Sequence, residues 1–69
     1  MMKNKTVEQL GTVVVGKWTV TGVLIDDCVI LRGKCADREL SKKYPYSRVA
    51  KKINEDFNQW VTDKFSFEV

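Results

Sequence analysis

The sequence lacks histidine altogether, and it has few of the motifs that build catalytic or metal sites. Without histidine, Ser-His-Asp and Cys-His nucleophile systems are excluded, as are the commonest zinc sites. The four glycines do not follow the spacing of a phosphate-binding loop, and the two cysteines do not form a C-x-x-C motif. The adjacent carboxylates Asp26 and Asp27 are more typical of a turn than of an acid/base pair. We therefore expect a binding protein that is not an enzyme and has no metal or cofactor.

Long apolar runs are also missing. The longest run, residues 28–31, has four residues, whereas a membrane-spanning helix needs about 20. No apolar segment follows the basic residues Lys3 and Lys5, so we expect no signal peptide. With 69 residues, 43% of them hydrophobic, and one proline, the composition is that of a single globular domain.

The two cysteines, Cys28 and Cys35, lie on one predicted strand. Their odd separation places them on opposite faces, and a rise of about 3.3 Å per residue sets them about 23 Å apart. They are too far apart to form a disulfide with each other. Free thiols indicate a reducing compartment, so we expect a bacterial cytoplasm. Because a core of this size is marginal alone, we also expect a homo-oligomer.

The predicted fold class is α+β: a small, curved, barrel-like antiparallel sheet of three to four strands packed with one helix. Residues 11–69 are expected to form this single domain, after a flexible N-terminus of residues 1–10. The N-terminal residues show no clear period, and one helical turn over residues 6–10 is the most structure that we expect there.

Residues 12–25 are rich in β-branched and aromatic side chains and are predicted to form strands, interrupted at Gly16. Asp26 and Asp27 are predicted to form a two-residue turn into a strand over residues 28–36. In this register Gly22 and Gly33 lie opposite large apolar residues, which favours a tightly curled sheet. One face then collects Trp18, Val20, Leu24, Val29, Leu31 and Cys35, and the other carries Val23 and Ile30 followed by Thr19, Thr21, Arg32 and Lys34.

Residues 36–44 are predicted to be a polar connection, and Pro45 starts or ends a helix. The helix is predicted from about Tyr46. Alternating aromatic residues then predict a closing strand over residues 65–69. A second possibility, which the pattern leaves open, is that residues 57–61 are a strand and not part of the helix. The apolar stripe of the predicted helix is Val49, Ile53, Phe57 and Trp60.

Positive charge is concentrated in residues 32–52, which carry a net charge of +6, whereas the rest of the chain carries −3. This asymmetry predicts an anionic partner, and the alternative is a solvated face rich in lysine. Within this region Tyr44, Tyr46 and Arg48 combine aromatic rings with a guanidinium group, a combination that can bind bases and phosphates. The alternative is that the tyrosines cover a sheet edge and Ser47 caps the helix.

The tryptophans are expected to be core or interface anchors in the first place. The side chains that we assign to the predicted binding surface are Trp18, Arg32, Lys34, Arg38, Lys42, Lys43, Tyr44, Tyr46 and Arg48.

Several short motifs run in a recognisable order over residues 16–69. They are Trp18-x-x-x-Gly22, Gly33 after the second strand, Ser47 with Val49, Val61-Thr62 and Phe65-x-Phe67. This order resembles that of small accessory proteins of tailed phages and prophages.

The resemblance implies a phage or prophage origin and a non-enzymatic protein that binds and inhibits or sequesters a host component. That component would be a host defence protein or its nucleotide signal. Two alternatives remain: a small nucleic-acid-binding regulator that uses the basic region of residues 32–52, and a structural subunit whose surface charge is incidental.

Overall fold

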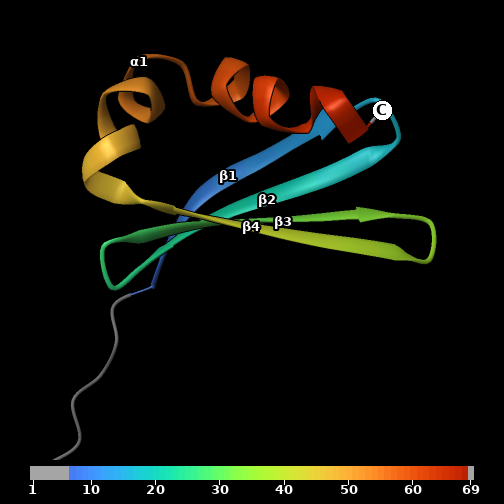
Figure 1. Cartoon of the computed structure of the whole chain (residues 1–69), viewed down its shortest axis with the longest axis horizontal. Helices are drawn as coiled ribbons and strands as arrows, with labels where there is room; N and C mark the ends of the chain where they lie inside the picture. Colours follow the sequence, from blue (N-terminus) through green and yellow to red (C-terminus); the bar gives the residue numbers. More distant parts are fainter. Residues whose placement is uncertain (1–6, 69) are drawn as a thin grey trace, which may run out of the picture.

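The chain folds into one antiparallel sheet with a helix across one of its faces, as shown by the computed structural model, which describes residues 7–68 (Figure 1). The α+β class is therefore confirmed. The sheet is open and twisted, with β1 and β4 at opposite edges, so the predicted barrel-like shape is wrong. The elements, in sequence order, are β1 (Val7–Val15), β2 (Trp18–Ile25), β3 (Cys28–Cys35), β4 (Arg38–Pro45), α1 (Tyr46–Phe65) and the 3-10 helix η1 (Ser66–Glu68).

The central hairpin of β2 and β3 has the predicted register. Asp26 and Asp27 form its two-residue turn with φ angles of 50° and 63°. Aspartate tolerates this left-handed region, which a type I′ turn requires at both positions. The pairing then runs outward from Ile25 opposite Cys28 through the length of both strands.

Two segments that the sequence patterns did not identify as strands belong to the sheet. Residues 7–10 are the start of β1 and not a helical turn, while residues 1–6 lie outside the described part of the chain. Residues 38–45 form β4, paired along its length with β3, and not a polar connection. A turn at Ala36 and Asp37, with Ala36 at a φ of 55°, joins these two strands. Pairing with a neighbouring strand thus overrides the weak strand propensity of the charged residues in β4.

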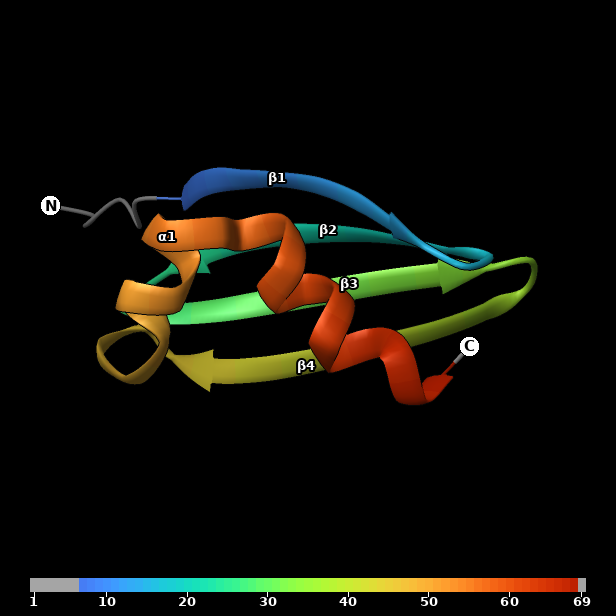
Figure 2. The same cartoon turned by 90° about the horizontal axis from the view of Figure 1, so that it is seen from above.

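The helix α1 crosses the sheet twice, because it bends sharply at Asp56 (Figure 2). Asp56 has non-helical dihedral angles, φ −159° and ψ 86°, which divide α1 into a first arm (residues 46–55) and a second arm (residues 57–65). Its carboxylate Oδ1 accepts a hydrogen bond from the backbone N–H of Gln59, at 3.1 Å. Asp56 is therefore the N-cap of the second arm.

The helical stripe of the sequence is confirmed, but the predicted closing strand is wrong. The second arm continues through residues 57–61, so the strand alternative for that segment is wrong as well. Phe65 is fully buried four residues after Val61, in helical spacing, whereas Phe67 is 89% exposed in η1. Val69 lies outside the described residues. No helix among residues 7–68 is apolar enough to cross a bilayer.

The core lies between α1 and one face of the sheet, where two aromatic rings rest on glycines. A Cβ atom added at Gly22 would lie 2.7 Å from Cζ of Phe57, and one added at Gly33 would lie 2.5 Å from Cε2 of Phe65. These glycines therefore make room for the rings of the helix and do not serve to curl the sheet. The buried core residues are Val13, Val15, Trp18, Val20, Val29, Leu31, Ile53, Trp60, Val61 and Phe65.

Both cysteines are free thiols, as predicted from their separation on one strand. Cys35 packs against the core, while Cys28 pairs with Ile25 on the other face of the sheet.

We expect Gly33→Ala to lower the free energy of unfolding by about 1–3 kcal/mol, because the new methyl group overpacks the contact with Phe65. Urea unfolding followed by tryptophan fluorescence measures the change. Thr19→Ala, an exposed substitution in the same sheet, is the control and should change it by about 0.5 kcal/mol or less. Adding Phe65→Leu to Gly33→Ala should cost less than the sum of the two single changes. An unchanged urea midpoint for Gly33→Ala would contradict the contact.

We expect Asp56→Ala to lower the free energy of unfolding by about 0.5–2 kcal/mol, because the second arm of α1 loses its N-cap. Asp56→Asn keeps an oxygen acceptor and should retain most of the stability. Glu55→Ala, at the neighbouring exposed position, is the matched control for a lost carboxylate. Equal destabilisation by the alanine and asparagine variants would show that charge, and not the cap, is what matters.

Candidate binding face

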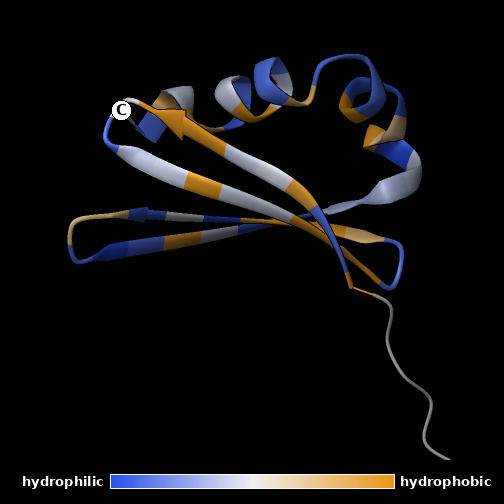
Figure 3. Cartoon of the chain, turned by 180° about the vertical axis from the view of Figure 1, so that it is seen from behind, coloured by the Kyte–Doolittle hydropathy of each residue, from blue (hydrophilic) through white to orange (hydrophobic). Residues whose placement is uncertain are grey.

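The sheet has one face under α1 and one face that no other element of residues 7–68 covers; we call the second one the open face (Figures 1 and 3). Side chains alternate between the faces along a strand, and directly paired residues share a face. Since Val20, Val29 and Leu31 are buried under the helix, the residues between them belong to the open face. Its four rows across β1–β4 are Val7-Ile25-Cys28-Pro45, Gln9-Val23-Ile30-Lys43, Thr12-Thr21-Arg32-Ser41 and Val14-Thr19-Lys34-Glu39.

One end of the open face is apolar. The strand segments next to the turn between β2 and β3 are coloured mostly hydrophobic in Figure 3. Val7 is 56% exposed there, and most of its neighbours are half-buried. The apolar end, as we use the name, comprises Val7, Val23, Ile25, Cys28, Ile30 and Pro45.

The rest of the open face is mostly polar and carries an excess of positive charge. Three cations, Arg32, Lys34 and Lys43, share the open face with one carboxylate, Glu39. The Lys34–Glu39 ion pair is 4.0 Å long and both side chains are about two-thirds exposed, so it contributes little to stability. Within the described part of the chain, Arg32 and Lys43 form no ion pair. The charge of this face is therefore available to a partner.

A shallow hollow of about 360 Å³ lies where the apolar and cationic parts meet. Its walls come from all four strands, with Gln9 of β1, Thr21 and Val23 of β2, Arg32 of β3 and Ser41 of β4 among them. The hollow therefore brings an apolar wall, hydroxyl groups and a guanidinium group together at the centre of the open face.

The residues assigned to a binding surface from the sequence do not form one surface. The alternation of side chains along the strands divides them between the two faces of the sheet, and two of them lie at the start of α1. Trp18, Arg38, Lys42 and Tyr44 lie on the helix side, Arg32, Lys34 and Lys43 lie on the open face, and Tyr46 and Arg48 lie in the first turn of α1.

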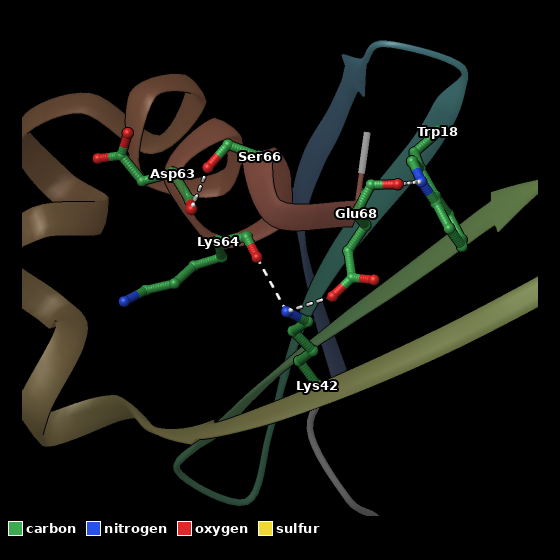
Figure 4. A network of polar contacts seen from close by, with 6 residues as sticks. All are labelled: Trp18, Lys42, Asp63, Lys64, Ser66 and Glu68. Atoms are coloured by element: carbon green, nitrogen blue, oxygen red, sulfur yellow. Dashed lines mark hydrogen bonds and ion pairs between the residues drawn. The ribbon is translucent and has the colours of Figure 1, made fainter.

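Trp18 and Lys42 hold the C-terminal end of the helix against the sheet (Figure 4). Trp18 is 3% exposed, and its Nε1 donates a hydrogen bond of 3.1 Å to the backbone carbonyl of Glu68. The ammonium of Lys42 donates to the carbonyl of Lys64 at 2.9 Å and lies 3.5 Å from the Glu68 carboxylate. A cation at the last carbonyls of a helix is stabilising. Both side chains therefore serve the fold, which confirms the interpretation of Trp18 as a core anchor.

Tyr44 is a packed residue as well. Its ring meets Trp60 edge-on, with centroids 5.2 Å apart and planes at 70°, and the Lys64 ammonium lies 5.6 Å from its centroid. Burial raises the pKa of the Tyr44 hydroxyl above its usual value, because the phenolate loses solvation. Tyr46 packs partly buried against the core. The Tyr44 ring is therefore occupied by packing within the fold.

The start of α1 has no side-chain cap. Its N-cap residue is Pro45, and Ser47 lies inside the first turn, so the predicted capping by Ser47 is wrong. The N–H of Tyr46 instead donates a hydrogen bond of 2.8 Å to the carbonyl of Asp27, in the turn between β2 and β3.

A second hollow, of about 410 Å³, lies between the two arms of α1. Trp60 and Val49 form its apolar part, and charges of both signs surround it, including Arg48 and Asp63. Its mixed charge selects no ligand class. Among residues 7–68, no three cysteine, aspartate or glutamate side chains gather in a way that could hold a metal ion.

The sequence patterns placed the β2 and β3 residues of the open face on one face and included Lys43 among the binding residues, but they did not place Lys43, Ser41 or Glu39 on that face, because β4 itself was missed. A signal was present: two-residue turns begin at residues 16, 26 and 36, which is a spacing of ten. Extending the confirmed register of β2 and β3 past the third turn would have placed Lys43 beside Ile30.

Comparison of the chain with family models, with curated proteins and with solved structures finds no match.

We expect the free energy of unfolding to fall as the pH rises above about 10, the pKa of an unfolded tyrosine. Burial favours the neutral phenol of Tyr44, so its contribution is complete below that pH and is lost as the pH rises through the higher folded pKa. Tyr44→Phe should reduce the fall, as measured by urea unfolding between pH 8 and about 11.

The two proteins differ in one hydroxyl group, so the difference between the two curves isolates Tyr44. Superimposable curves for the wild type and Tyr44→Phe would contradict the argument.

Proposed function

We propose that this protein is a non-enzymatic binding protein whose open face docks onto a protein partner and blocks it. The observation that carries the proposal is the juxtaposition, on one uncovered sheet face, of an apolar end and a group of three cations with one carboxylate. The partner surface that fits is an apolar patch bordered by aspartate or glutamate side chains.

The apolar end supplies the part of an interface that excludes water. Protein interfaces combine an apolar centre with a polar rim, and an exposed apolar patch on a small domain marks a contact site. Ile25, Ile30 and Val23 lie side by side on two central strands, held rigidly by the confirmed register of the hairpin. A rigid patch loses little conformational entropy on binding.

The cations supply orientation and selectivity. Arg32 and Lys43 are exposed and lie immediately beside the apolar end, where Lys43 pairs with Ile30 across the strands. An excess of positive charge next to an apolar centre steers and selects an acidic partner. Arginine is also enriched at interface centres, because its planar fork binds carboxylates in two places.

Aromatic placement favours a protein over a nucleotide or a single-stranded nucleic acid. Recognition of bases relies on exposed aromatic faces, and the sixteen open-face positions hold no aromatic residue. Trp18, Tyr44 and Trp60 all pack between the sheet and α1. The open face could therefore contact the phosphates of a nucleic acid through its cations, but it has no aromatic ring for the bases.

The resemblance to small phage and prophage accessory proteins favours a host protein as the partner, and the host bacterial cytoplasm as the place of action. The free thiols Cys28 and Cys35 agree with a reducing compartment. Inhibition then needs no chemistry, because a domain that covers an acidic surface of a host protein prevents that surface from being used.

We expect Arg32→Glu combined with Lys43→Glu to weaken binding to the partner at least about tenfold, or about 1.4 kcal/mol. The probe is the host protein that wild-type protein retains from a bacterial lysate, purified and then titrated by calorimetry. Val23→Asp, at the apolar end, should weaken binding by at least as much, because it places a charge in the centre of the interface.

Lys51→Glu combined with Lys52→Glu is the matched control, since both side chains are exposed on the first arm of α1. This variant reverses the same number of charges away from the open face and should bind like the wild type. Loss of binding in the control but not in the open-face variant would contradict the proposal. Tight binding to a DNA duplex, with a log–log salt slope near −0.9 per phosphate, would favour the nucleic-acid alternative.

A further inference from the structure

The first strand of the sheet, β1, has an outer edge whose backbone groups are unpaired among residues 7–68. β1 and β4 are the two edge strands. In an antiparallel ladder every second residue of an edge strand directs its N–H and C=O away from the sheet. Within the described part of the chain, the one backbone hydrogen bond outside the helices and the ladder joins Tyr46 to Asp27, far from β1 along the chain.

The two edges differ in their protection against pairing with another strand. Edge strands are commonly protected by charged side chains and by proline. β4, with the sequence RELSKKYP, carries four charged residues and ends in Pro45. β1, with the sequence VEQLGTVVV, carries a single charge, at Glu8, and no proline.

Exposed apolar side chains lie on the same unprotected strand. Of the three large hydrophobic side chains that are exposed among the described residues, two belong to β1: Val14 at 69% and Val7 at 56%. Exposure of β-branched residues on an edge strand is typical of a strand that pairs with another chain.

An irregularity at Leu10, between Gln9 and Gly11, limits where a further strand can pair. The ladder resumes at Gly11, which has a φ of 140° and pairs with Gly22, and it continues to Val15. Beyond this glycine, the regular and uncharged part of the edge is the segment of residues 12–15, T-V-V-V.

We infer that β1 pairs with β1 of a second copy of this chain, antiparallel and centred on Val13 within residues 12–15, to form a symmetric dimer with one continuous sheet. A two-fold axis perpendicular to the sheet relates the two strands, so the same segment meets itself and the contact closes at two copies. Backbone hydrogen bonds supply the pairing, and Val14 becomes covered by the edge of the partner's open face.

The charge distribution favours this edge over other routes to self-association. Stacking two open faces would bring Arg32, Lys34 and Lys43 of both copies together. Pairing along β4 would bring together the four charged side chains of each copy, three of which are cations. The segment of residues 12–15 carries no charge, so it meets a copy of itself without such repulsion.

Sedimentation equilibrium tests the inference on the full chain. The wild type should show a mass of twice 8.0 kDa at concentrations of tens of micromolar, and Val14→Lys should sediment as a monomer at the same concentration. Lysine on an edge strand is a natural barrier to pairing, and the high exposure of Val14 makes the substitution compatible with folding.

Thr19→Lys is the matched control. Thr19 is exposed and pairs with Val14 in the same row of the open face, one strand inward from the edge. The Thr19→Lys variant adds the same charge in the same row of the open face and should leave the dimer intact. A monomeric wild type at 200 µM, or a Val14→Lys protein that remains a dimer, would overturn the inference. If both variants were monomeric, the result would contradict the β1 edge as the dimer interface.

Amide hydrogen exchange of the wild type gives a second measurement that needs no variant. The outward-facing amides of residues 12–15 should exchange more slowly as the protein concentration rises through the dimerisation range, while β4 amides should not change. Equal protection at all concentrations would contradict pairing at β1. Partner binding by the open face is a separate measurement, since its key cations lie on β3 and β4.

Discussion

The close contact of two phenylalanine rings with glycine backbone is the constraint on which the rest of this structure depends. Phe57 rests on Gly22 and Phe65 rests on Gly33, in positions where any side chain on the sheet would collide with the rings. Both rings belong to the second arm of α1, which begins after the bend at Asp56, the residue that ends the first arm and caps the second. The bend lets a helix of 20 residues cover one face of a four-stranded sheet and complete a single core.

This arrangement places nearly all aromatic side chains on one side of the sheet, and it decides what the other side can do. In the sequence, residues 42–45 are one continuous basic and aromatic segment, but a strand turns successive side chains to opposite faces. Lys42 and Tyr44 therefore serve the helix side, while Lys43 joins Arg32 on the open face. The sequence shows where positive charge lies along the chain, whereas the alternation of side chains along each strand decides which charges share a face.

The sequence was sufficient for elements that local chemistry controls. The turn at Asp26 and Asp27 fixed the register of the central hairpin, and a four-residue apolar spacing fixed the course of the helix from Tyr46. It was insufficient for β4, whose charged residues become a strand through pairing with β3. It also failed at Phe65, because one alternating pair of phenylalanines imitates a strand, and helical packing on Gly33 decides the outcome. The open face could be predicted in part, since half of its positions, two in every row, lie on that central hairpin.

A domain of this size buries few residues, and what it leaves unburied is correspondingly informative. The core absorbs every available aromatic ring except Phe67, while the open face keeps apolar residues at one end and β1 keeps an uncharged edge. These two surfaces differ in the kind of partner that they fit. The cationic excess around Arg32 repels a copy of the same face and attracts an acidic one, whereas the neutral segment of residues 12–15 is complementary to itself.

Joining two chains along β1 would extend the open face without covering Arg32 or Lys43, because both lie on the far half of the sheet. Self-association and partner binding are therefore compatible in one sheet, and the dimer would present two partner-binding surfaces on the same side.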